Sequence, residues 1–188
     1  MLPEQIKNFR EMVTLRDGAY VLLRAMTCED KGRLMDFYNA VSPEDLQYFR
    51  HDVKDGSLIE DWCEHLDYSD VLPIIALAKE RIVGSATLHF SSGPKRHIGE
   101  VRLFLGKDYR KRGLGMKMIR ALIDLARKQG LSILLAEVIA DKNKVVKAFE
   151  QLGFHADCTL DDYFMFPDGD CSNVVVMTMS LRPKIDEF

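Results

Sequence analysis

The segment Glu100–Gly130, "EVRLFLGKDYRKRGLGMKMIRALIDLARKQG", decides the fold of this chain. An apolar stretch of strand length leads into three basic residues and a Gly-Leu-Gly, and apolar residues at helical spacing then continue to Gly130. The N-terminus of a helix already carries a partial positive charge. Basic residues at that point are therefore unfavourable unless an anion binds there, so the segment predicts an anion site between a strand and a helix.

The loop itself narrows the chemistry of that anion. Gly113 and Gly115 leave room for a ligand, while Arg110, Lys111 and Arg112 place positive charge beside the free N–H groups of the first helical turn. This combination favours a phosphate or pyrophosphate. The spacing fits neither GxGxxG nor GxxxxGK[ST], so the two common nucleotide motifs are excluded. The alternative is a solvated basic loop in front of an ordinary amphipathic helix.

The rest of the sequence predicts strands and helices in an irregular order. A strand is followed by two or three helices, three or four strands, a helix, a strand, a helix and one or two strands, which indicates a mixed α/β or α+β domain and not a doubly wound sheet. Residues 1–18 are expected to form an N-terminal arm or helix, and residues 19–188 a single domain. Helices are expected at 27–41, 42–50, 57–68, 113–129 and 143–154, and strands within 19–26, 71–92, 97–109, 131–140 and 173–181.

Composition and charge exclude several classes of protein. The chain has 188 residues, of which 47% are hydrophobic and 29% charged, as is typical of a globular domain with a sizeable core. Its net charge of −3 does not point to nucleic acid. No apolar run reaches about 18 residues and the N-terminus lacks the apolar core of a signal peptide, so we expect a cytoplasmic protein without a membrane partner. The four cysteines have no CxxC or zinc spacing, so no metal is predicted.

Three stretches of the sequence resemble one family. The stretch "RKRGLG" (Arg110–Gly115) resembles the R/Q-x-x-G-x-G/A signature of the GNAT N-acetyltransferases, and "ILLAEVIADKNKVVKAFEQLGF" (Ile133–Phe154) resembles that family's fifth strand and the helix ending in Leu-Gly-Phe. The stretch "FYNAVSPEDLQYFRHD" (Phe37–Asp52) is similar to the bacterial protein-lysine acetyltransferase branch. The resemblance implies a central, mostly antiparallel sheet of about seven strands flanked by four or more helices.

The resemblance also implies acetyl-CoA as the cosubstrate and assigns residues to it. Backbone N–H groups of the basic loop would hold the pyrophosphate, the strand before it would pair with the pantetheine arm, and an aromatic residue of the last helix would pack beside that arm. An asparagine before that helix is a further cofactor contact of the family. Aligned on Gly153–Phe154, its position falls on Lys142, with Asn143 one place later, so either the turn slips by one residue or this contact is altered. The cofactor-binding residues implied are Leu103, Phe104, Leu105, Arg110, Lys111, Arg112, Gly113, Leu114, Gly115, Met116, Asn143 and Phe149.

Glu100 is the candidate general base. Transfer of an acetyl group to an amine needs a base, because an amine with a pKa near 10.4 is protonated at pH 7. Glu100 lies ten residues before Arg110, an offset that matches the glutamate of the lysine-acetylating branch. The alternative is a surface carboxylate paired with Arg102 or Lys95. His89 and His97 flank the same strands and are reserve candidates for a base or relay.

Two further features bear on the chemistry. Many family members place a tyrosine that protonates the leaving thiolate where this chain has Phe149, which cannot donate a proton, and Tyr163 is the nearest tyrosine in sequence. Acidic residues gather near the expected C-terminal hairpin, where they could attract a cationic amine or simply form a solvated turn. They are Asp161, Asp162, Asp168 and Asp170.

The sequence therefore favours an acetyl-CoA-dependent N-acetyltransferase acting on a primary amine, either a small molecule or a protein lysine, as a monomer or homodimer. A non-catalytic acyl-CoA sensor, a small-molecule acetyltransferase for a polyamine, amino acid or antibiotic, and a nucleic-acid-binding module are the alternatives. Phe149 favours the sensor and Glu100 the enzyme. The net charge of −3 and the lack of interleaved aromatic residues disfavour nucleic acid.

Overall fold

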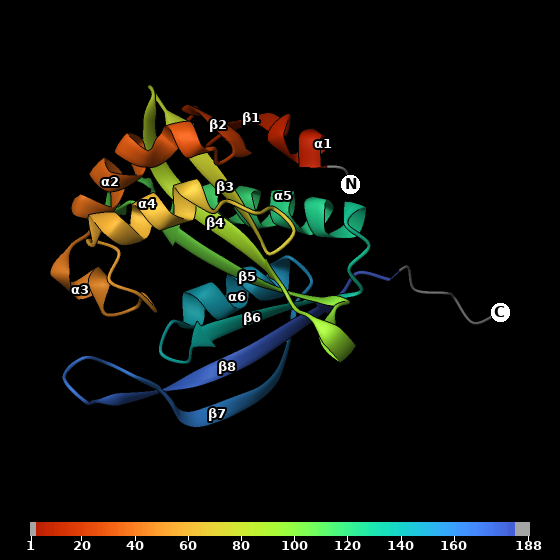
Figure 1. Cartoon of the computed structure of the whole chain (residues 1–188). Coiled ribbons are helices and arrows are strands. Elements are labelled where there is room, and N and C mark those ends of the chain that lie inside the picture. Colours follow the sequence, from red (N-terminus) through yellow and green to blue (C-terminus); the bar gives the residue numbers. More distant parts are fainter. Residues whose placement is uncertain (1–2, 183–188) are drawn as a thin grey trace.

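A computed structural model describes residues 3–182 of the chain. One eight-stranded sheet in the order β1-β2-β3-β4-β5-β6-β8-β7 runs through the molecule (Figure 1). The strands are β1 (Arg10–Thr14), β2 (Tyr20–Ala25), β3 (Val71–Ala78), β4 (Arg81–Phe90), β5 (Ile98–Leu105), β6 (Ile133–Ile139), β7 (His155–Met165) and β8 (Cys171–Ser180). The α-helices are α1 (Pro3–Lys7), α2 (Lys31–Asn39), α3 (Pro43–Leu46), α4 (Gly56–Glu64), α5 (Leu114–Lys128) and α6 (Asn143–Gln151). Three short 3₁₀ turns are η1 (Cys28–Asp30), η2 (Gly93–Lys95) and η3 (Lys107–Tyr109).

The mixed α/β class expected from the sequence is confirmed, with eight strands in place of about seven. Neighbouring strands are antiparallel except for β5 and β6, which are parallel. A parallel pair needs a crossover, and α5 provides it. None of the helices in residues 3–182 has the length and hydrophobicity needed to span a bilayer.

The helices cover opposite faces of the sheet. α5 carries a strongly apolar stripe, and Leu114, Met118, Ile119 and Leu122 are buried against one face together with Phe149 of α6. α2 and α4 pack on the other face, where their buried side chains form a second, smaller cluster. Successive residues of β5 and β6 therefore point alternately toward α5 and toward the α2–α4 side.

Three elements differ from the sequence expectations. Residues 10–14 lie in the expected N-terminal arm but form β1, because Val13 is buried and the strand pairs fully with β2. The helix expected at 42–50 is only α3, which ends at Leu46. The sequence does not indicate β7 as a separate strand, because its nearly continuous exposure leaves no alternating pattern.

Candidate functional site

β5 and β6 separate along their length, and this separation organises the candidate site. The two strands pair over only three residues each, ending at Glu100 and Leu135. Beyond that point β5 stays bonded to β4 as far as Leu105, and β6 stays bonded to β8 as far as Ile139. Figure 1 shows the two strands diverging. The facing backbone groups beyond Glu100 can therefore pair with an extended ligand in the manner of an added strand.

The loop between β5 and α5 presents the open end of a long helix. Gly113 precedes α5 with a φ of +86°, and Lys111 also has a positive φ of +61°. The hydrogen bond from the N–H of Lys117 to the carbonyl of Gly113 (3.3 Å) marks the first helical turn. The N–H groups between these two residues lie ahead of the helical ladder and can bind an anion.

The two glycines of the loop have different structural roles. A Cβ atom at Gly115 would lie 3.0 Å from Cδ2 of Leu103 and 3.3 Å from Cδ1 of Leu105, so glycine lets α5 approach β5 closely. A Cβ atom at Gly113 would meet only the flexible side chain of Arg16, at 3.4 Å or more, so the constraint there is the positive φ. Gly115 thus makes room for β5, whereas the sequence had suggested room for a ligand.

The arginines of the loop are paired with acids from distant segments. Arg110 donates to both carboxylate oxygens of Asp45 (3.0 and 2.8 Å), which belongs to α3. Arg112 donates to Asp17 (2.6 Å), in the turn between β1 and β2. Lys111 is exposed. The basic loop is therefore largely neutralised, and its backbone N–H groups are better placed than its guanidinium groups to bind an anion.

Two carboxylates meet where the strands part. Glu100 of β5 accepts hydrogen bonds from Nε of Arg102 (2.8 Å) and from Nη2 of Arg50 (2.9 Å). The same Nη2 of Arg50 donates to Glu137 of β6 (2.7 Å). Burial alone would raise the pKa of the Glu100 carboxyl, but the hydrogen bond and charge of Arg102, together with the charge of Arg50, outweigh it and lower that pKa. Glu100 is therefore ionised at neutral pH.

A family model for the acetyltransferase (GNAT) family matches residues 34–154, more than half of the chain. The chain belongs to this family. The match includes the parting of β5 and β6 and the basic loop, so the resemblance seen in the sequence is confirmed.

Curated relatives match only part of their own length. Acetyltransferase PA5475 from Pseudomonas aeruginosa is 30% identical over 123 residues, which are 62% of this chain and 65% of that protein. The [ribosomal protein bS18]-alanine N-acetyltransferase from Escherichia coli is 30% identical over 87 residues, 45% of this chain and 58% of that enzyme.

Solved structures of GNAT proteins share the fold along nearly the whole chain. The GNAT domain of PAT from S. lividans has a TM-score of 0.75 at 21% identity, and the match covers 96% of this chain and 99% of that domain's chain. The putative acetyltransferase yncA from Salmonella typhimurium, described with its cofactor acetyl-CoA, has a TM-score of 0.75 at 17% identity and covers 95% of this chain and 98% of its own.

Within this GNAT protein, the strand residues assigned to the pantetheine arm face two sides. Leu103 and Leu105 pack on the α5 side, whereas Phe104 packs on the α2–α4 side, 4.6 Å between ring centroids from Phe49. Side chains that alternate in this way cannot all contact one ligand.

Backbone groups alternate along a strand as well: the N–H of Gly106 donates to the Val83 carbonyl, so the backbone groups of Phe104, two residues earlier, also face β4. The backbone groups of Leu103 and Leu105 face the gap between the strands, where the Leu105 carbonyl accepts from Nε of Arg110 (3.0 Å). The backbone role that the resemblance implied therefore stays a prediction for Leu103 and Leu105 and does not fit Phe104.

The α6 residues assigned to the cofactor lie apart from one another. Asn143 is the first residue of α6 and is exposed, and Lys142 precedes it with its Nζ 4.7 Å from the centroid of the Tyr48 ring. Phe149 is buried and meets the ring of Phe154 at 5.0 Å in an edge-to-face contact. Contacts of Asn143 and Phe149 with a cofactor remain predictions.

The two histidines differ in their distance from the carboxylates. His89 of β4 lies directly across the sheet pairing from Glu100, with its Nε2 2.9 Å from Oγ1 of Thr87. Burial, followed by the charge of Arg102, lowers the pKa of His89 to about 4, so its ring is neutral at pH 7. His97 lies at the closed end of the β5–β6 pair, where its carbonyl accepts from Ser132. His89 is therefore the reserve candidate nearest to Glu100.

Sequence reasoning missed Glu137 and Arg50. A signal existed for Glu137, because a carboxylate interrupts an apolar stretch of strand length, and buried carboxylates are rare unless paired. No signal identified Arg50, which lies in the irregular segment after α3, 50 residues from Glu100 and 87 from Glu137 along the chain.

The tip of the β7–β8 hairpin contacts the segment that follows α3. The ring of Phe166 lies 5.7 Å from that of Tyr48, edge to face. Asp162 has a positive φ of +50° in an irregular part of β7, and Tyr163 beside it is 55% exposed. The expected acidic hairpin is therefore present, with its tip beside Tyr48, but Tyr163 faces solvent and no contact connects it to Glu100 in the described residues.

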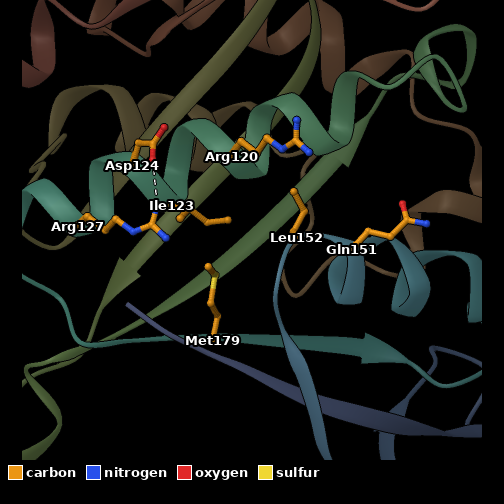
Figure 2. A pocket seen from close by; sticks show the side chains of 7 residues that line it. All are labelled: Arg120, Ile123, Asp124, Arg127, Gln151, Leu152 and Met179. Carbon is orange, nitrogen blue, oxygen red and sulfur yellow. Dashed lines mark hydrogen bonds and ion pairs between the residues drawn. The ribbon is translucent and has the colours of Figure 1, made fainter. Parts of the chain in front are cut away.

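A separate hollow lies away from these residues, between α5 and α6 (Figure 2). It has a volume of about 290 Å³ and contains none of the residues that the sequence assigned to a site. Its lining consists of Arg120, Ile123, Asp124, Arg127, Gln151, Leu152 and Met179.

Proposed function

We propose that this protein transfers the acetyl group of acetyl-CoA to a primary amine, with Glu100 as the general base. The observation that carries the proposal is the carboxylate pair, Glu100 and Glu137, at the parting of β5 and β6. One cationic nitrogen, that of Arg50, already lies within hydrogen-bonding distance of both. An ammonium group needs the same arrangement of acceptors.

The residues present fit acetyl-CoA. The parted strands turn the backbone groups of alternate β5 residues, Leu103 among them, toward the pantetheine arm, and the N–H groups at the start of α5 suit a pyrophosphate. Acetyl-CoA supplies an activated acetyl group as a thioester. The residues of this chain would orient the amine and accept its proton at a carboxylate oxygen of Glu100, directly or through water. Phe149 has no proton to give, so water would supply the proton that the leaving sulfur needs.

The acceptor class follows from charge. Glu100 and Glu137 flank the place where the amine would bind, which favours a cationic acceptor such as a polyamine or a lysine side chain. The [ribosomal protein bS18]-alanine N-acetyltransferases among the relatives act on a protein, which makes a protein amine the first class to try.

The test combines binding with turnover. Calorimetric titration with acetyl-CoA should show one saturable site, and release of thiol should then be followed with polyamines, amino acids and lysine peptides as acceptors. Thiol release with one class of amine supports the enzyme. Binding of acetyl-CoA without turnover on any acceptor would instead favour the acyl-CoA sensor, and the absence of binding would overturn both.

A further inference from the structure

Arg50 bridges two strands with a single nitrogen. Its Nη2 atom lies 2.9 Å from Oε1 of Glu100 and 2.7 Å from Oε2 of Glu137. The Arg50 side chain is 42% exposed, whereas the two carboxylates are 19% and 22% exposed. The arginine therefore covers the carboxylates from the solvent side and is itself free to move outward.

The contact resembles that of an ammonium group more than that of a typical arginine. Guanidinium groups usually bind carboxylates with two nitrogens in a fork, as Arg110 does with Asp45. Arg50 instead uses one nitrogen for two different carboxylates, as the compact head of an alkylammonium ion does. An ammonium nitrogen can replace that atom without any rearrangement of the acids.

The two carboxylates would respond differently if Arg50 left. Glu100 keeps Arg102, which donates to both of its oxygens (2.8 and 3.1 Å), and His89 beside it is neutral. For Glu137, Arg50 is the one cation bonded to it in residues 3–182. Removal of Arg50 would leave two like charges close together, an unfavourable state that a new cation relieves.

We infer that Arg50 holds the place of the acceptor's ammonium group, and that a cationic acceptor binds by displacing it from Glu100 and Glu137. The inference rests on the proposed function for the identity of the displacing cation. Arg50 would then select acceptors by competition, because only a ligand that carries its own positive charge can replace it without leaving the two carboxylates unpaired.

The displacement can be tested without any acetyl transfer. In Arg50→Ala the place between the carboxylates is open, so ethylammonium chloride should produce saturable amide shifts in NMR spectra around Glu100 and Glu137. We expect binding about tenfold tighter than in the wild type, a difference of about 1.4 kcal/mol, and no such effect of sodium chloride at equal ionic strength. Arg50→Lys should behave like the wild type. The double variant Arg50→Ala/Glu137→Gln should lose the binding.

Two results would overturn the inference: equal binding of ethylammonium to the wild type and Arg50→Ala, or no binding to Arg50→Ala. If that variant does not fold by circular dichroism, Arg50→Gln takes its place. Once an acceptor is known, its KM should fall in the variant while the KM for acetyl-CoA stays unchanged, and an increase in the acceptor KM would also contradict displacement. If ethylammonium binds as expected but no amine is acetylated, the proposed function fails and the cation site stands.

Discussion

The basic loop and the carboxylate pair lie at the same parting of β5 and β6, and both are neutralised from within the chain. In the loop, Arg110 and Arg112 are covered by acids from α3 and from the β1–β2 turn. In the carboxylate pair, Glu100 and Glu137 are covered by Arg50. Neither region therefore presents a bare cluster of charge, although the sequence suggests one in the loop.

The difference lies in which groups remain for a ligand. The ion pairs of the loop engage side chains and leave the N–H groups at the start of α5 open. The ion pairs of the carboxylates engage the very oxygens that would bind an amine. If the proposed function holds, acetyl-CoA can bind without breaking an ion pair, whereas the acceptor cannot. Because the acceptor exchanges one cation for another at the carboxylates, salt screens the ion pairs that break and those that form alike, so acceptor binding should respond to salt less than binding of the anionic acetyl-CoA.

Glu100→Gln should have the largest effect. The amide keeps the size of the side chain but cannot accept a proton, so we expect kcat/KM to fall by about 10²- to 10⁴-fold. Because the loop is untouched, calorimetry should give an unchanged Kd for acetyl-CoA. The exposed Glu11→Gln on β1 is the matched control. A kcat/KM within about threefold of the wild type would remove Glu100 from catalysis and leave Glu137 as the candidate base.

Gly115→Val tests whether the loop depends on the close approach of α5 to β5. Even a Cβ would lie 3.0 Å from Leu103, so the larger side chain should push the helix away and destabilise the fold by about 1–3 kcal/mol. Urea unfolding measures the loss, and the Kd for acetyl-CoA should rise. Gly32→Ala, in α2, where a Cβ meets nothing within 4 Å, is the control. Unchanged stability would show that the helix start tolerates displacement.

The pH dependence of stability tests the environment of His89, which pairs with Glu100 across β4 and β5. Its folded pKa of about 4 lies below the ordinary value of 6.5, so the unfolded chain binds more protons between these values. The stability that a neutral His89 contributes is present above pH 6.5 and is lost as the pH falls toward 4. His89→Gln should remove on the order of 1 kcal/mol of this loss, allowing for partial exposure of the ring. Urea unfolding at several pH values between 4 and 7 measures it, and an identical pH dependence in the variant would contradict the assignment.

The sequence predicted one of these regions better than the other. β5, the basic loop and α5 follow one another along the chain, and a strong helical period with a glycine start is a local signal. The carboxylate pair and its cover come from three separate segments, so no local pattern connects Arg50 with Glu137. The acids that cover the loop are equally distant: Asp45 lies 65 residues from Arg110 and Asp17 lies 95 from Arg112. Motifs identify backbone sites well, whereas charge compensation between distant segments requires the fold.

Asp45→Asn should have the smallest effect and bears most directly on the contrast between the two regions. The substitution releases the Arg110 guanidinium, which hydrogen bonds to the Leu105 carbonyl but loses its ionic partner. A freed cation beside the helix start should tighten acetyl-CoA binding by about two- to fivefold, since partly exposed ion pairs are worth about 0.2–1 kcal/mol. Calorimetry at low and high salt measures it, and the gain should shrink as salt screens the charge.

Asp17→Asn is the companion control for this prediction. Arg112 would still donate to the Asp108 carbonyl (3.2 Å) and lie over the Tyr109 ring, so its charge should stay where it is and the Kd should change less. If Asp45→Asn instead weakened acetyl-CoA binding, the Arg110–Asp45 pair would be part of what shapes the loop. Asp45 would then be needed for acetyl-CoA to bind, whereas Arg50 is proposed to leave when the acceptor binds. The ion pairs of the two regions would therefore have opposite effects on ligand binding.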